Sequence, residues 1–373
     1  MRPPEQTVGT KTDRIPSISL YRLFAMSLFR SAVVFFTLQS RLAIVNFLVI
    51  ALICAVFAAD PEPKLRKAAK ASKPATAEAD QKKDPVEEEY DKLLEQDEAA
   101  LKEVERLNAE FEKFDTKGAA GSKAVLAGKI DQTLEPVRKA YEEFLLKHSK
   151  HVDGRIAYGS FLNELGEEED AIVQWEKARE LDPKNPSPWN NLANVYAHIG
   201  PIKKAFQYYE KAIELDPKEP VYLQNLATVT YLFRKDAVET YRIDEEGVFA
   251  KALDLYQRAM KLDPDNILLA TDYAQSFYGI KPLRADDAVA AWKHALTLAK
   301  SDAEKEGIYL HLARVELNSG HFVDADQHLS MVKDPEMLEL RDRLRRNLEK
   351  KRTEAENTSK PNASSEKIEA SSK

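Results

Sequence analysis

The sequence predicts an all-α protein built as a stack of helical hairpins. One segment occurs three times with the same pattern, as WEKARELDPKN at 175–185, YEKAIELDPKE at 209–219 and YQRAMKLDPDN at 256–266. The first two copies lie 34 residues apart, a period at which pairs of helices repeat. Glycine accounts for only 12 of 373 residues, which leaves few of the tight turns that sheet proteins need. We therefore expect a helical solenoid.

Residues 1–59 have the layout of a secretory signal. Their apolar run, from Leu42 to Ala59, follows several arginines and ends in small residues. The run is also about long enough to cross a bilayer, which takes roughly 20 residues, so an uncleaved single-pass anchor is the alternative. Both interpretations place the repeats outside the cytoplasm, for example in a periplasm, and confine membrane contact to this segment. Met26 is an alternative to Met1 as the start residue.

Two zones are expected between this leader and the repeats. Residues 60–85 are polar, rich in lysine and alanine, and predict a flexible linker. Residues 86–117 predict a charged amphipathic helix, and its apolar side chains recur at spacings of three, four or seven residues: Leu94, Leu101, Val104, Leu107, Phe111 and Phe114. Such a stripe is typical of a cap on the first repeat or of a short coiled coil between copies. The cap is favoured because the stripe spans fewer than four heptads.

The repeats are predicted to occupy 130–335 as about four to five hairpins. In the copy that ends at Pro217, large and small side chains follow one another at fixed offsets: Trp189, Leu192, Ala193, Tyr196, Gly200, Ala205, Tyr209, Ala212 and Leu215. This alternation lets two helices approach closely and interdigitate. The third copy carries 13 extra residues near 234–246. A charged C-terminal helix is expected over 336–356, followed by a disordered tail over 357–373.

This order of residues resembles the tetratricopeptide repeat (TPR). The resemblance implies a right-handed superhelical solenoid whose concave groove is lined by the first helix of each hairpin and binds a protein or peptide partner. Members that hold a C-terminal carboxylate use lysine and arginine in this groove, whereas this chain has Asn190 and Asp272 at or near those positions. A clamp of that kind is therefore not expected. The large aromatic residues of the repeats are expected in the core, without a binding role: Trp175, Tyr209, Tyr256 and Trp292.

Neutral polar and aromatic side chains are expected to line the groove: Asn190, Asn191, Asn194, Gln224, Asn225, Thr228, Tyr231, Thr271, Gln275 and Tyr278. An amide side chain pairs with both the N–H and the C=O of an extended backbone, so this set suits a peptide in a strand-like conformation. Alternatively, the asparagines are part of the repeat pattern and bond between neighbouring helices. For Asn191 and Asn225 the two interpretations carry equal weight.

The sequence gives no indication of catalysis, of a metal site or of a cofactor. It contains no nucleophile elbow, phosphate-binding loop or dinucleotide fingerprint, and its seven histidines form no HExxH pair. The single cysteine, Cys54, excludes an internal disulfide, and the formal net charge of −7 argues against a nucleic-acid partner. We therefore expect a non-catalytic adaptor that binds a partner protein or peptide. The alternative is a membrane-associated oligomeric scaffold for envelope assembly or secretion that uses the 86–116 helix.

Overall fold

The computed structural model describes residues 84–115 and 123–359. These residues form helices joined by turns and contain no strand, so the all-α fold class is confirmed for this part of the chain. The predicted leader, most of the predicted linker and the end of the predicted tail lie outside the described residues. Within the described ranges, none of the helices has the length and apolar character needed to cross a bilayer.

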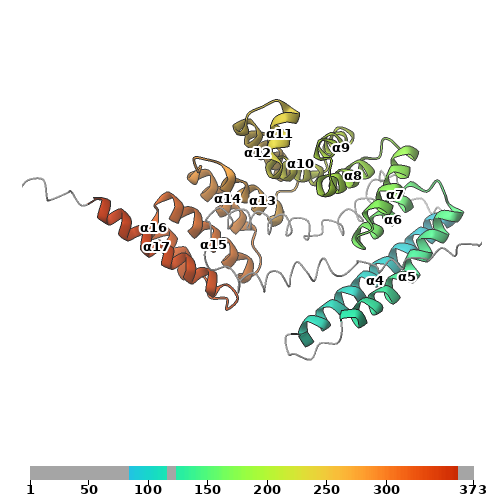
Figure 1. The fold of residues 1–373 in the computed structure, drawn as a ribbon, viewed down its shortest axis with the longest axis horizontal. Helices are drawn as coiled ribbons and strands as arrows, with labels where there is room; N and C mark the ends of the chain where they lie inside the picture. The colour runs from blue at the N-terminus through green and yellow to red at the C-terminus, as the bar shows by residue number, and fades with distance from the viewer. Residues whose placement is uncertain (1–83, 116–122, 360–373) are drawn as a thin grey trace, which may run out of the picture. The chain divides into compact units, whose positions relative to one another are not determined.

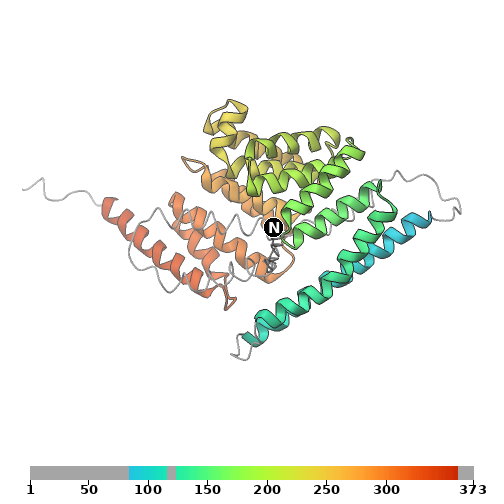
Figure 2. The ribbon, with the colours of Figure 1, turned by 45° about the vertical axis from the view of Figure 1, so that its right-hand side comes forward.

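The chain divides into two compact units, one that ends at Val195 and one that begins at Tyr196. The division falls inside helix α8 (Pro186–Ile199). In unit 1, the long helices α4 (Pro85–Asp115) and α5 (Lys123–Lys147) lie side by side, as Figures 1 and 2 both show. The hairpin of α6 (Val152–Glu164) and α7 (Glu168–Leu181) follows them.

Helix α4 buries one face inside unit 1. Leu93, Ala100 and Leu107 are buried on this face, whereas Leu94 and Leu101, on the stripe read from the sequence, are half-buried. The Tyr141 hydroxyl of α5 donates a hydrogen bond of 2.6 Å to Asp97 Oδ2 of α4. The apolar face of α4 therefore packs within its own chain.

The α6–α7 hairpin is held by a close approach of backbone and indole. Trp175 of α7 is buried, and its Nε1 donates to the carbonyl oxygen of Ile156 in α6 at 3.1 Å. Gly159 lies directly under the ring. Between the helices, Gly166 adopts a φ of 77°, the left-handed region that favours glycine. The glycines of this hairpin thus permit both the contact and the turn.

Unit 2 is itself a stack of helical hairpins. Its helices are α9 (Ile202–Leu215), α10 (Pro220–Leu232), α11 (Arg234–Tyr241), α12 (Glu245–Leu262), α13 (Ile267–Ser276), the 3₁₀ turn η1 (Phe277–Gly279), α14 (Ala285–Leu298), α15 (Asp302–Ser319), α16 (Phe322–Ser330) and α17 (Leu338–Ser359). The hairpins pair α10 with α12, α13 with α14, and α15 with α16. Helix α10 also contacts α13, so first helices of successive hairpins are neighbours.

The insertion near 234–246 forms the short helix α11 and the turn that follows it. Tyr241 at the end of α11 packs against Phe206 of α9, with ring centroids 5.4 Å apart. Arg242 then adopts a left-handed conformation, and the Asp244 side chain accepts a hydrogen bond from the Gly247 backbone N–H to cap α12. The extra residues therefore add a folded helix to the third hairpin.

The core of unit 2 runs through the stack. Trp292 of α14 is buried among alanines of α13 and α14 and beside Ile308 and Leu312 of α15. Tyr209 and Tyr256 are buried as well. At the C-terminal end, Leu348 of α17 closes a second cluster against α15 and α16. Aromatic and small side chains thus occupy the interior, as the periodic pattern predicts.

Candidate functional site

The three asparagines of α8 belong to unit 1 and differ in exposure. Asn190 and Asn191 are buried, and Asn190 Nδ2 donates to Asn191 Oδ1 at 3.4 Å. Asn194 is half-buried. A peptide backbone can bond only to an amide that is accessible, and Asn194 is the only one of these three asparagines that is not buried. A role in binding stays a prediction for each of them.

In unit 2 we define the first-helix face as the surface formed by α10, α13 and α15. On α10, Thr228 is buried and shares a hydrogen bond of 2.8 Å with the Tyr256 hydroxyl. Gln224 donates from Nε2 to Asp272 Oδ2 of α13 at 2.8 Å. Asn225 is half-buried. Gln224 and Thr228 therefore already link neighbouring helices.

The aromatic residues of the predicted groove also bond across helices. Tyr231 lies against the backbone of Gly279, where an added Cβ would come within 2.8 Å of its hydroxyl. The Tyr278 hydroxyl lies 3.0 Å from His311 Nδ1 of α15 and 3.3 Å from the His311 carbonyl oxygen. The guanidinium of Arg314 covers the Tyr278 ring at 5.0 Å. These contacts fix both tyrosines in place.

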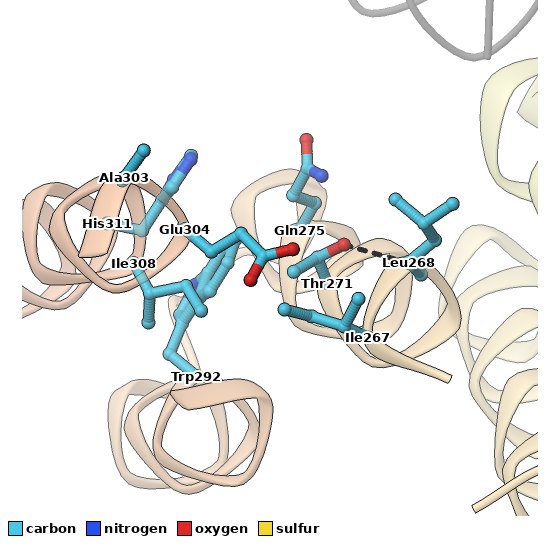
Figure 3. Close-up of a pocket in the computed structure, with 10 residues that line it drawn as sticks. Ile267, Leu268, Thr271, Gln275, Trp292, Ala303, Glu304, Ile308 and His311 are labelled. Carbon is cyan, nitrogen blue, oxygen red and sulfur yellow. Dashed lines mark hydrogen bonds between the residues drawn. The ribbon is translucent and has the colours of Figure 1, made fainter. Parts of the chain in front are cut away.

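Thr271 and Gln275 of α13 line a cavity, which Figure 3 shows between α13, α14 and α15. Its volume is about 260 Å³, and its other lining residues are Ile267, Leu268, Trp292, Ala303, Glu304, Gly307, Ile308 and His311. Thr271 Oγ1 donates to the Leu268 carbonyl oxygen of its own helix at 2.8 Å. The Gln275 amide has no hydrogen-bond partner among the described residues, and Figure 3 shows it projecting at the cavity mouth.

The wall of the cavity formed by α14 and α15 is aromatic and uncharged near neutral pH. The imidazole of His311 stacks on the Trp292 indole with ring centroids 4.1 Å apart and an angle of 9°. Burial and, to a smaller extent, the nearby Arg314 charge together lower the pKa of His311 to about 4. His311 therefore presents a neutral ring beside the cavity.

Two carboxyl groups of this face have pKa values shifted in opposite directions. Burial raises the pKa of Asp272 to about 6, against the opposing effect of its bond with Gln224. Glu304 is exposed, and its Oε2 accepts backbone N–H bonds from Ser301 at 2.9 Å and Lys300 at 2.7 Å. These bonds lower the pKa of Glu304. Figure 3 shows its carboxylate extending across the cavity toward α13, so the mouth carries a fixed negative charge.

The structure brings together only part of the predicted set with residues that the sequence pattern missed. Thr271 and Gln275 share the cavity with Glu304, Ile308 and His311, which all lie on α15. Trp292 is buried as predicted, yet it also forms part of the cavity lining. The spacing of these three residues could have indicated a shared surface, because positions 304, 308 and 311 fall on one side of a helix.

Comparison with known families agrees with the hairpin geometry. A TPR repeat model matches residues 159–200, and a tetratricopeptide repeat model matches residues 186–219. The chain therefore contains tetratricopeptide repeats. The matched residues of this TPR protein run from α6 to the turn after α9. A comparison with curated proteins found no match.

Several solved structures resemble this TPR protein at low sequence identity. YrrB, described as a TPR protein with an unusual peptide-binding site, is 17% identical with a TM-score of 0.43, over 56% of this chain and 99% of its own. PilF from Pseudomonas aeruginosa is 21% identical with a TM-score of 0.41, over 55% and 87%. The C-terminal part of a TPR repeat-containing protein from Cytophaga hutchinsonii is 15% identical with a TM-score of 0.43, over 68% and 98%.

Proposed function

We propose that this TPR protein is a non-catalytic adaptor that binds an extended segment of a partner protein on its first-helix face, outside the cytoplasm. TPR proteins in general act by binding other proteins. The observation that carries the finer proposal is the surface of α13, where the half-buried Gln275 amide has no hydrogen-bond partner among the described residues and adjoins an open cavity. The amide NH₂ group in this position can donate hydrogen bonds to a peptide backbone, and the amide oxygen can accept one from it.

The titratable groups of this face support binding rather than catalysis. Asp272 is bonded to Gln224, and the His311 ring is bonded to the Tyr278 hydroxyl while it stacks on Trp292. Their shifted pKa values thus follow from burial within contacts between helices. Structural contacts of this kind perturb pKa values just as active sites do.

The rival proposal of an oligomeric scaffold needs a free apolar stripe on α4. The structure packs Leu93, Ala100 and Leu107 of α4 inside unit 1, chiefly against α5. A seam that used this buried face would separate α4 from α5 and expose these side chains, at about 25 cal/mol per Å² of apolar area. This burial favours the adaptor.

The proposed location rests on the sequence alone. The apolar run at 42–59 and the arginines before it suit either a cleaved signal or an anchor, and both lead to export of the repeats. The repeats are expected to be protected from added protease in intact cells. This protection should be lost when the outer barrier of the cell is opened. Recovery of the full chain in the cytosolic fraction would contradict the location.

Site-specific photocrosslinking tests the binding face. A benzoylphenylalanine placed at Thr271, on the first-helix face, is expected to form adducts with partner polypeptide in cells that express the full chain. The matched control places it at Lys293, an exposed position on α14. Equal adduct yields at the two positions, or adducts at Lys293 alone, would overturn the assignment of the binding face.

A further inference from the structure

The cavity between α13, α14 and α15 is kept open by a glycine. Gly307 lies inside the 18-residue helix α15, where glycine costs roughly 0.5–1 kcal/mol relative to alanine. A Cβ built on Gly307 would meet no heavy atom within 4 Å, although the residue lines the cavity. The space above the helix is therefore not needed by any neighbouring side chain. A Cβ at this position fits without a clash, and a larger side chain would extend from it into the open space that the cavity occupies.

The floor and one edge of the cavity are apolar. Ile267, Ile308 and Trp292 form the floor, and Leu268 at the edge is 62% exposed. Ligand pockets for whole small molecules start at about 300 Å³, so a cavity of about 260 Å³ suits part of a larger ligand. The exposed Leu268 extends the apolar surface beyond the cavity itself. A partner that occupies this cavity is therefore expected to reach past it.

The polar groups at the mouth differ between its two ends. Along α13 the lining runs from Leu268 through Thr271 to Gln275, and along α15 it runs from Glu304 to His311. Glu304 Oε1 has no hydrogen-bond partner among the described residues, because both bonds to this carboxylate use Oε2. Gln275 and His311 lie two helical turns beyond Leu268 and Glu304 on their respective helices. The Glu304 carboxylate at the mouth thus attracts a cation, and the Gln275 amide can form hydrogen bonds with a peptide backbone.

We propose that this cavity takes one aliphatic or aromatic side chain of an extended peptide, and that a lysine or arginine within two residues of it pairs with Glu304. The proposal rests on the function proposed above and names the chemistry of its partner. The apolar side chain packs on Trp292 beside Gly307, and the peptide backbone beyond it bonds to the Gln275 amide. The occupant is a segment of another protein rather than a small molecule, because the cavity of about 260 Å³ is smaller than a pocket for a whole ligand and the exposed Leu268 extends its apolar surface at the edge.

Selection from a random dodecapeptide display library tests this chemistry. The full chain serves as the target, and the Gly307→Leu variant, whose side chain fills the cavity, serves for counter-selection. The selected peptides are expected to share one apolar residue with a lysine or arginine within two positions. Peptides that also bind Gly307→Leu, or that lack either feature, would overturn the proposal, and so would a selection that enriches no sequence.

Affinity measurements on one selected peptide, by fluorescence anisotropy, separate the two contacts. Gly307→Leu is expected to weaken binding about 10- to 100-fold, because burying one large apolar side chain contributes about 1.5–3 kcal/mol. Glu304→Gln keeps the helix cap and removes the charge, and a roughly 3-fold loss is expected for an exposed ion pair. That loss should vanish for a peptide in which norleucine replaces the basic residue. An equal loss for both peptides would overturn the ion pair.

A matched variant controls for folding. Gly128 also lies inside a helix, α5 of unit 1, and a Cβ there would likewise meet nothing within 4 Å. Gly128→Leu should leave peptide affinity unchanged, and circular dichroism should show equal helicity for both variants. If crosslinks from Thr271 persist in Gly307→Leu, the proposed binding function stands but the proposed role of the cavity is refuted. If the wild type forms no adducts from Thr271, the proposed binding function itself is refuted.

Discussion

The close contact between Gly159 and Trp175 makes a sharp prediction about stability. A Cβ at Gly159 would lie 2.5 Å from Trp175 Nε1 and 2.7 Å from its Cδ1. These atoms belong to a rigid indole that is 1% exposed and bonded to Ile156, so it has no free space to enter. We expect Gly159→Ala to destabilise unit 1, although alanine favours a helix more than glycine does.

The expected magnitude follows from three contributions. Alanine in a helix interior gains roughly 0.5–1 kcal/mol over glycine. Overpacking a closely packed core costs typically about 1–3 kcal/mol. If the indole moves, its bond to the Ile156 carbonyl is lost, and an unsatisfied buried polar group costs about 1–3 kcal/mol. When all three contributions apply, the net loss in unfolding free energy is about 1–5.5 kcal/mol.

Urea denaturation followed by far-ultraviolet circular dichroism measures this difference. Gly128→Ala is the matched control, because its Cβ would meet nothing within 4 Å and the same substitution should raise stability by about 0.5–1 kcal/mol. The two alanine variants should thus move the transition in opposite directions. A Gly159→Ala protein as stable as the Gly128→Ala protein would refute the packing argument.

Three further predictions concern charge and capping. Because burial holds the pKa of His311 at about 4, the folded state binds fewer protons than the unfolded chain, and the unfolding free energy falls as the pH is lowered from about 6.5 to 4, by at most about 3 kcal/mol. Asp272, whose pKa is raised to about 6, has the opposite effect on the unfolding free energy over about pH 4–6. The His311 contribution is therefore measured as the difference in unfolding free energy between wild type and His311→Phe at each pH. A difference that does not change with pH would contradict this prediction. Arg138 binds Glu167 with two bonds of 2.7 and 2.6 Å, and Arg138→Lys should lower stability by about 1 kcal/mol in urea titrations, since lysine cannot form the paired contact. Ser301→Ala removes the cap of α15 and should cost about 0.5–2 kcal/mol, measured by thermal unfolding; an unshifted midpoint would show that the cap is dispensable.

The periodic pattern predicts the hairpins because each hairpin buries the same positions. Trp175, Tyr209, Tyr256 and Trp292 recur at the position where a second helix meets its first helix, and all four are buried. The periodic pattern does not predict the buried face of α4 as well. There the buried face includes Asp97, a carboxylate that bonds with Tyr141, and a search for apolar side chains passes over such a residue. Helix α5 also begins at Lys123, ahead of the predicted start of the repeats at residue 130.

The candidate site was harder to predict, because surface chemistry depends on which polar groups are already bonded. The repeat pattern places Thr228 and Gln275 at comparable positions, yet Thr228 is bonded inside the helix stack and Gln275 is not. Which amides are satisfied is decided by tertiary partners such as Asp272. The cavity depends on Gly307, whose role appears only once the space above it is known. Sequence periodicity therefore predicts the face but not its open part.

Hydrogen exchange on the full chain, with and without a photocrosslinked or co-purified partner polypeptide, tests the central claim most directly. The bound partner is expected to slow exchange in α10, α13 and α15, with the largest effect around Thr271 and Gly307. Protection confined to α4 and α5, with the first-helix face unchanged, would contradict it.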